Sequence, residues 1–170
     1  MRTLSYIVGL LVLFSTISCK KDDIVSIRDA QATNNAITVT NYKYFERIPI
    51  VETSISAGGK VDITMALPAD SPRSFKEITR VAASTINASI NASSVQRTTG
   101  LYQTAIAASG KSITYSTTLA DYMAFKKLTA MPSTTTGGIV TYTDMQFFFL
   151  ITLDDNSTVI PYEIRARIRQ

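Results

Sequence analysis

The sequence predicts an all-β fold: an antiparallel β-sandwich of the immunoglobulin or fibronectin type with at most one short helix. Short runs of alternating apolar and polar residues recur along the chain, as in strands that bury one face. Glycine, proline, asparagine and aspartate punctuate these runs, and only one stretch has helical spacing. Seven or eight short strands in residues 36–170 favour two packed sheets. A closed barrel is the alternative fold.

The first half contains the earliest predicted strands. Ile37 and Val39 alternate with polar residues, and apolar residues continue through 42–45 and 48–55. Gly58-Gly59 then indicates a turn. Residues 61–67 alternate most regularly, and Pro68 ends that run. Residues 75–82 are expected to form a further strand.

The middle of the chain changes in composition. Residues 83–100 are rich in Ala, Ser, Thr and Asn, which favours a long loop. Residues 101–107 and 112–118 are predicted as two strands joined across Ser109-Gly110-Lys111. The spacing of apolar residues in 119–128 predicts a short helix, and residues 132–138 are expected to form a loop.

The C-terminal segment predicts a hairpin, because Asp154-Asp155-Asn156-Ser157 separates two β-rich runs. A turn centred on Asp155-Asn156 pairs residues whose numbers sum to 311, which makes one face almost wholly apolar. That face comprises Phe147, Phe149, Ile151, Leu153, Thr158, Ile160, Tyr162 and Ile164. On the other face Asp144 falls opposite Arg167 and Gln146 opposite Arg165. Pro161 cannot donate a ladder hydrogen bond, so its strand is expected at an edge or with a bulge.

The N-terminus has the parts of an export signal. Arg2 precedes a short apolar run over residues 6–14, and small or polar residues lead to Cys19, the only cysteine. A membrane span needs roughly 20 apolar residues, and this run is shorter. Cysteine after such a cut accepts the diacylglycerol of lipoprotein maturation, and its freed amine accepts a further acyl chain such as palmitate. Ordinary secretion and a retained anchor are the alternatives.

Two features of this segment resemble a known protein class. Thr16-Ile17-Ser18-Cys19 resembles a bacterial lipobox, although Thr16 stands where leucine is commoner. The continuation Lys20-Lys21-Asp22-Asp23 resembles that of Bacteroidota surface lipoproteins. The resemblance implies a signal peptide over residues 1–18 and a lipidated N-terminus at Cys19. The polar composition of the residues that follow predicts a tether, so that 19–35 form the lipidated N-terminus and tether. The remaining residues, 36–170, are expected to form one domain. It also implies an outer-membrane protein, attached through Cys19 and facing outward.

Composition limits the chemistry of the domain. The chain has no histidine, so a Ser-His-Asp or Cys-His centre and an ordinary zinc site are excluded. A lone, acylated cysteine leaves no disulfide, so packing must stabilise the fold. The net charge of +4, which loss of Arg2 would lower by one, gives no footprint for nucleic acid. We expect no cofactor.

The most tempting candidate for a binding surface is a basic stripe. Arg165, Arg167 and Arg169 alternate with Ile164, Ala166 and Ile168, so the arginines share one strand face. They could bind an acidic glycan or a partner's carboxylates. The alternative is a solvated outer face with Asp144 and Glu163 nearby. Five tyrosines could build an aromatic platform for sugars, or be half-buried strand residues: Tyr42, Tyr44, Tyr102, Tyr115 and Tyr142.

Other motifs favour ordinary turns. Ser109-Gly110-Lys111-Ser112 and Gly58-Gly59-Lys60 resemble the end of a phosphate-binding loop, but no helix pattern follows the first, and Val61 replaces the hydroxyl after the second. Asp154-Asp155-Asn156 could offer oxygens to calcium, although such runs are more often solvated turns.

The expected function is therefore a non-catalytic one at the cell surface: glycan or nutrient capture, or assembly with an outer-membrane partner protein. A structural adhesin or fimbrial subunit is the alternative, with the Pro161 strand as its exposed edge. A carboxylate-pair hydrolase would need two acidic residues converging in a cleft. The candidates are Glu46, Glu52, Asp62, Glu77, Asp121 and Asp144.

Overall fold

The computed structural model describes residues 37–86 and 90–170, all within one compact unit, Asn34–Gln170. The predicted signal peptide, the tether and Cys19 lie outside the described residues. The described elements, in chain order, are β1 (Thr38–Val39), β2 (Tyr44–Phe45), β3 (Pro49–Ser54), β4 (Lys60–Ala66), β5 (Phe75–Thr85), the 3-10 helix η1 (Ala92–Gln96), β6 (Gln103–Ala107), β7 (Ser112–Thr118), α3 (Leu119–Lys126), β8 (Ser133–Thr136), β9 (Ile139–Tyr142), β10 (Met145–Leu153), β11 (Thr158–Val159) and β12 (Ile164–Arg169).

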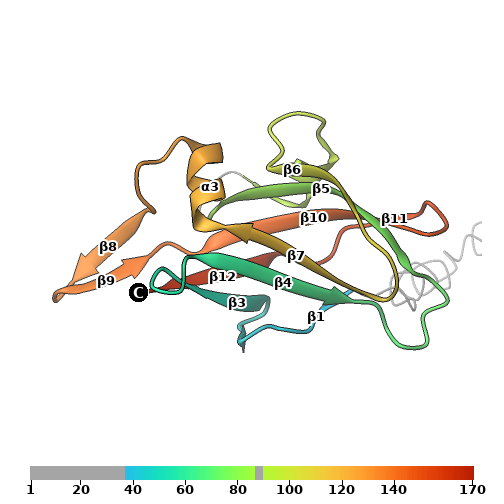
Figure 1. Ribbon diagram of the computed structural model, residues 1–170, viewed down its shortest axis with the longest axis horizontal. Helices are drawn as coiled ribbons and strands as arrows, with labels where there is room; N and C mark the ends of the chain where they lie inside the picture. The colour runs from blue at the N-terminus through green and yellow to red at the C-terminus, as the bar shows by residue number, and fades with distance from the viewer. Residues whose placement is uncertain (1–36, 87–89) are drawn as a thin grey trace, which may run out of the picture. The chain divides into compact units, whose positions relative to one another are not determined.

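The strands form two packed sheets and a separate hairpin. The larger sheet has the order β2-β3-β12-β10-β5-β6, with β11 also paired to β10, and the smaller has the order β1-β4-β7. β8 and β9 form a two-stranded hairpin that projects from the domain at the left of Figure 1. Every pair is antiparallel except β3 with β12, which run parallel. The expected all-β sandwich with one short α-helix is confirmed.

The core lies between the two sheets. Alternate residues of β4 and β7, such as Ile63 and Tyr115, face Phe147, Phe149 and Ile151 of β10, and all five side chains are buried. The ring of Tyr115 meets that of Phe149 edge to face at 5.1 Å between centroids. A smaller apolar cluster lies under η1, on the opposite face of the larger sheet, and comprises Ala82, Val95 and Phe148. β10 is therefore buried on both faces along most of its length.

The strands predicted over 61–67, 75–82 and 112–118 and the helix over 119–128 are present as β4, β5, β7 and α3. Thr118 caps α3 by accepting a hydrogen bond from the Asp121 N–H, and Lys127 ends it in the left-handed conformation. At the turn before β4, Gly59 has φ +68°, and a Cβ there would lie 3.0 Å from Leu119 Cγ. Glycine is thus required by both conformation and space.

Three expectations about connections are wrong. Residues 83–100 are not one long loop, because β5 continues to Thr85 and Ala92–Gln96 form η1. The expected loop over 132–138 contains β8. β6 and β7 do not pair as a hairpin, since they belong to different sheets. Small polar residues mask the strand pattern in the first two cases, and composition cannot say which sheet a strand joins in the third.

The C-terminal hairpin is confirmed in one half and wrong in the other. Between β10 and β12 the register is the predicted one, with Phe147 opposite Ile164 and Gln146 opposite Arg165. Next to the turn β10 and β11 pair one residue out of that register, with Ile151 opposite Val159. Asn156, at φ +65°, closes a three-residue turn in which the Leu153 N–H donates to the Ser157 carbonyl.

The irregular segment around Pro161 absorbs this one-residue shift. Tyr162, expected on the apolar face, is therefore 81% exposed, whereas Ile164 is fully buried. Thr158, expected on the same face, is exposed too. β12 follows Pro161 but is not an edge strand, because it lies between β3 and β10. The proline occupies the break between β11 and β12, where no ladder hydrogen bond is needed.

Candidate functional site

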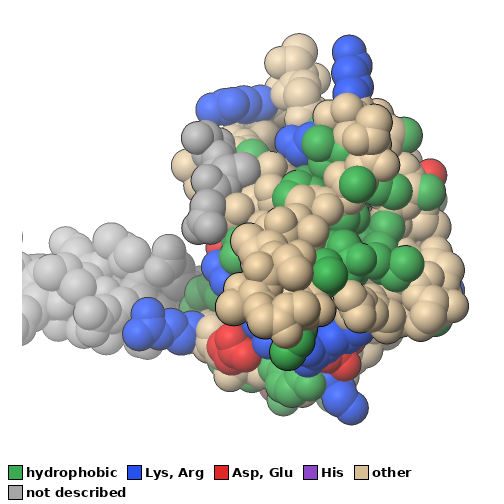
Figure 2. Space-filling model, turned by 90° about the vertical axis from the view of Figure 1, so that its left-hand side faces the viewer, with side chains coloured by type: hydrophobic (Ala, Val, Ile, Leu, Met, Phe, Trp, Pro, Cys, Tyr) green, Lys and Arg blue, Asp and Glu red, His purple; other side chains and the backbone are tan. Residues whose placement is uncertain are grey.

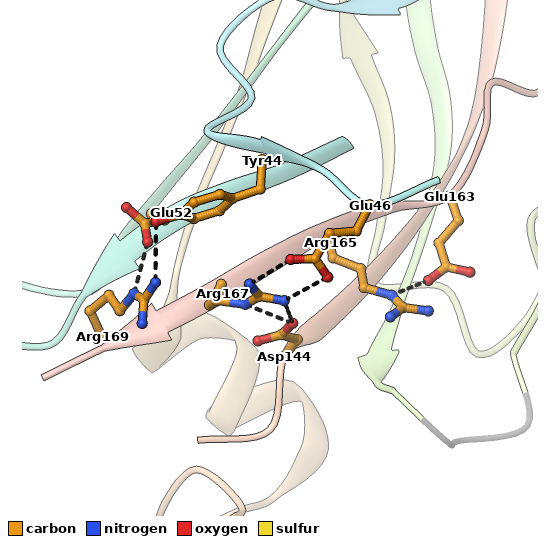
Figure 3. Close-up of polar contacts among 8 residues, drawn as sticks. All are labelled: Tyr44, Glu46, Glu52, Asp144, Glu163, Arg165, Arg167 and Arg169. Atoms are coloured by element: carbon orange, nitrogen blue, oxygen red, sulfur yellow. Dashed lines mark hydrogen bonds and ion pairs between the residues drawn. The ribbon is translucent and has the colours of Figure 1, made fainter. Parts of the chain in front are cut away.

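The arginine face, which we define as the outward face of β12 and its neighbours, is the densest cluster of charged residues described. Arg165, Arg167 and Arg169 lie on it, while Ile164 and Ile168 of the same strand enter the core. The parallel neighbour β3 contributes Glu52, directly opposite Arg167. Figure 3 shows how carboxylates from four separate segments meet the three arginines.

Arg167 is the centre of this face. Its Nη1 lies 3.2 Å from Glu46 Oε1, and its Nη2 lies 3.2 Å from Asp144 Oδ2. The pairing with Asp144 is the one that the predicted hairpin register requires. Asp144 is 8% exposed as a residue, so its charge depends on this partner. Hydrogen bonds with Glu46 and Asp144 raise the pKa of Arg167 despite partial burial.

Arg169 forms the second part of the network. Its Nε donates to Glu52 Oε1 at 2.8 Å, and its Nη2 donates to the Tyr44 hydroxyl at 3.3 Å. The hydrogen bond from Arg169 lowers the pKa of Glu52. The Tyr44 ring also lies beneath two guanidinium groups, 5.6 Å from Arg167 Cζ and 6.0 Å from Arg169 Cζ. Such cation–π contacts add to the ion pairs.

Arg165 pairs locally, with Nε 2.6 Å from Glu163 Oε1. Each arginine of the stripe thus has a carboxylate partner, and four carboxylates meet three guanidinium groups. The solvated face with Asp144 and Glu163 nearby is therefore the arrangement the structure has. An anionic ligand would have to displace an existing partner, so this surface is better suited to recognition by several polar hydrogen bonds than to capture of a lone anion.

Sequence reasoning missed Glu46, Glu52 and Tyr44 as partners of the arginines. They lie 121, 117 and 125 residues from the arginines that they bond. Nothing in the sequence indicates the parallel pairing of β3 with β12 that brings them together. The alternation in residues 164–169 does indicate that the arginines share a face, which the structure confirms.

The carboxylates proposed for a hydrolase are spread over the domain. Asp62 bonds Lys60 and Ser116, Asp121 belongs to the α3 cap, and Glu77 accepts from Thr79. Glu46 and Asp144 do converge, but on the guanidinium of Arg167. The resolved carboxyl pKa shifts, those of Glu52, Asp62 and Asp155, are all downward, whereas a general acid needs an upward shift.

The motifs that resemble phosphate-binding loops are turns with internal partners. Gly110 has φ +73°, and Lys111 Nζ donates to the Ala69 carbonyl at 2.6 Å. The turn 154–157, the candidate site for calcium, also has internal partners. The Asp155 carboxylate accepts a hydrogen bond from the Ser157 hydroxyl and forms an ion pair with Arg73 at 3.0 Å. Within residues 37–86 and 90–170, no group of three or more His, Cys, Asp or Glu is placed to hold a metal ion.

The five tyrosines do not form one platform. Tyr115 is buried in the core, and burial raises its pKa. Tyr102 packs against the rings of Tyr122 and Phe125 and bonds Thr117. Tyr142 belongs to the β8–β9 hairpin. Of the five, only Tyr42 and Tyr44 lie close in sequence, Tyr44 in β2 and Tyr42 two residues before it.

Comparison with known proteins gives no relative: no family model, curated protein or solved structure matches this chain. None of the helices in the described part of the chain has the length and apolar character needed to cross a membrane.

Proposed function

We propose that this protein is a lipid-anchored component of the outer face of a bacterial envelope, where it binds a glycan, a nutrient or a partner protein without catalysis. The observation that carries the proposal is the position of Cys19. It follows a short apolar run and a lipobox-like tetrapeptide, and it precedes the described domain by a polar stretch. Acyl chains on this residue would anchor the domain stably.

The chemistry of the domain supports a binding role over an enzymatic one. The sequence has no histidine, which is the usual general base and proton shuttle. The carboxylates that converge, Glu46 and Asp144, share an arginine rather than a proton. The arginine face instead presents ordered donors, acceptors and an aromatic ring, Tyr44, on a rigid sheet.

Purification of the native protein from detergent-solubilised envelope tests this proposal. We expect an outer-membrane protein or a polysaccharide to co-purify, and we expect Arg167→Met to reduce its recovery. Arg73→Met is the control, because Arg73 forms its ion pair in the turn 154–157. Recovery of no companion, with the anchored protein intact and folded, would contradict a binding role.

A structural subunit joined by strand addition is the second candidate, and the free edge of β7 favours it. The Leu119 N–H donates to the Gly59 carbonyl, and the Leu67 N–H donates to the Lys111 carbonyl. The backbone N–H and C=O groups of the odd-numbered residues of β7 therefore point toward β4. Thr114 and Ser116 therefore direct their backbone groups outward. β7 carries no charge and no proline, the usual protections of an edge strand. β12, the strand expected to fill this role, is enclosed by its neighbours.

Concentration-dependent assembly tests the second candidate. Light scattering of the purified domain should show growth of oligomers with concentration, and Thr114→Lys should abolish it by placing a charge on the β7 edge. Thr104→Lys, on β6 at an edge of the larger sheet, is the matched control. A monomer at all concentrations would remove this candidate.

A further inference from the structure

The turn between β1 and β3 exposes two aromatic side chains. Phe45 is 63% exposed and Tyr42 is 49% exposed, and their rings meet edge to face at 5.8 Å. Lys43 and Arg47 on the same turn are also exposed. We call these four residues the aromatic-basic turn. β2, which lies inside it, pairs with β3 over only two residues.

The polypeptide enters the domain along the same edge. β1 and the residues after it follow β4, where the Thr40 N–H and the Asn41 side chain bond Thr64 and Asp62. Tyr42 follows directly. Figure 1 draws β1, β3 and the turn between them along the lower border of the domain. Figure 2 shows hydrophobic, basic and acidic side chains next to one another at that lower border.

The length of chain before the domain determines which surfaces the turn can meet. Residues 20–36 separate Cys19 from Ile37, which gives a reach of about 60 Å when extended. This length limits how far the domain can lie from a membrane that holds Cys19. Any contact between domain and membrane is then intramolecular, so a weak contact is sufficient to be populated.

The side chains of the turn match the chemistry of a headgroup layer. Tyrosine and phenylalanine bury their rings at the level between acyl chains and headgroups. Lysine and arginine beside them pair with lipid phosphates. Arg47 is suited to this because it forms no ion pair with another residue of 37–86 or 90–170, whereas Glu46 pairs with Arg167. Glu46, the acidic side chain of this turn, shares the guanidinium of Arg167 with Asp144.

We propose that the aromatic-basic turn, Tyr42, Lys43, Phe45 and Arg47, docks on the lipid headgroup surface to which Cys19 is attached. This rests on the proposed function, since it assumes a domain tethered to a membrane. Docking would lay the β1–β2 edge against the membrane and leave the β8–β9 hairpin and the β7 edge facing outward or sideways. The lipid on Cys19 would then hold the domain at the membrane, and the contact of the aromatic-basic turn with the headgroups would fix the orientation of the domain there.

Tryptophan fluorescence tests the proposal, because the chain contains no tryptophan. Phe45→Trp places one reporter in the turn, and Ile139→Trp places the control in the β8–β9 hairpin at a residue that is 70% exposed. The chain from Cys19 to Gln170 is prepared without acylation and joined through its only cysteine to a maleimide lipid. The vesicles contain phosphatidylethanolamine and phosphatidylglycerol, with brominated lipid as the quencher.

We expect quenching at position 45 to exceed that at position 139 by at least threefold. Adding Lys43→Ser and Arg47→Ser should halve the quenching at position 45, and circular dichroism should confirm that each variant folds. Equal quenching at the two positions overturns the proposal. A response of the Phe45→Trp reporter to soluble envelope polysaccharide but not to vesicles overturns it as well, and assigns the turn to glycan binding.

The chemical anchor keeps this test independent of the proposed function. The maleimide lipid holds Cys19 at the vesicle whether or not the cell acylates it. Failure of docking therefore leaves the lipoprotein proposal standing, and absence of native acylation leaves the measured docking standing.

Discussion

The two faces of β12 are built on different principles. Ile164, Ala166 and Ile168 enter the core, where apolar burial alone makes the contact. Arg165, Arg167 and Arg169 alternate with them. Arg165 pairs with the nearby Glu163, whereas Arg167 and Arg169 meet carboxylates from distant parts of the chain. The inner face can be satisfied by any apolar neighbour of suitable size, whereas the outer face needs particular partners. Most of the folding stability should therefore come from the inner face, whereas the outer face should determine which segments pair with one another.

The largest effect should follow from a cavity on the inner side. Phe149→Ala removes a ring that is fully buried against Tyr115, and we expect the free energy of unfolding to fall by about 3–5 kcal/mol. Urea denaturation followed by circular dichroism measures this loss. Phe45→Ala, an exposed phenylalanine, is the control and should cost well under 1 kcal/mol by the same reasoning.

The next largest effect should arise at the centre of the outer face. Arg167→Met leaves the carboxylate of Asp144 nearly buried and without its cation, so we expect a loss of about 2 kcal/mol. Arg169→Met is the matched control. Its ion pair with Glu52 is more exposed, so we expect a smaller loss than for Arg167→Met. Equal losses for the two variants would contradict the central position given to Arg167.

Acid should weaken the outer face before the inner one. The hydrogen bond from Arg169 lowers the pKa of Glu52 below its ordinary value of 4.5. A carboxyl group with a lowered pKa in the folded protein stabilises it above pH 4.5, and this contribution is lost as the pH falls through the lowered value. Glu52→Gln should therefore flatten the decline of stability over the acid range that begins at pH 4.5 and runs downward. Thermal denaturation across that range measures it, and an unchanged slope would count against the pairing.

The smallest effect should occur where the hairpin register differs from expectation. Tyr162 is 81% exposed, so Tyr162→Ser should change the free energy of unfolding by no more than about 0.5 kcal/mol. Ile164→Ala, two residues later on a fully buried side chain, should cost about 2–5 kcal/mol. Comparable losses at the two positions would indicate that both side chains are buried, as the uninterrupted hairpin register predicts.

The elements that could be predicted from sequence are those with strong local patterns. Alternation indicates β4 and β7, the β-rich run before Asp154 indicates β10, and the spacing of apolar residues indicates α3. Local pattern cannot say that β6 and β7 enter different sheets or that β3 runs parallel to β12. Those pairings depend on contacts between distant segments, whose free energies no short window contains.

The candidate site also has features that local sequence patterns predict and features that depend on contacts between distant segments. The shared face of Arg165, Arg167 and Arg169 and the pairing of Arg167 with Asp144 follow from alternation and hairpin register. Glu46, Glu52 and the aromatic-basic turn do not, because their positions depend on the β2–β3–β12 arrangement.

The intact mass of the mature protein, purified from envelope in detergent, tests the central claim most directly. We predict a chain that begins at Cys19 and carries the added mass of two or three acyl chains. The Cys19→Ala variant should lack that increment and leave the membrane fraction. A mature protein that retains residues 1–18, or that begins near Cys19 without acyl mass, would contradict the account.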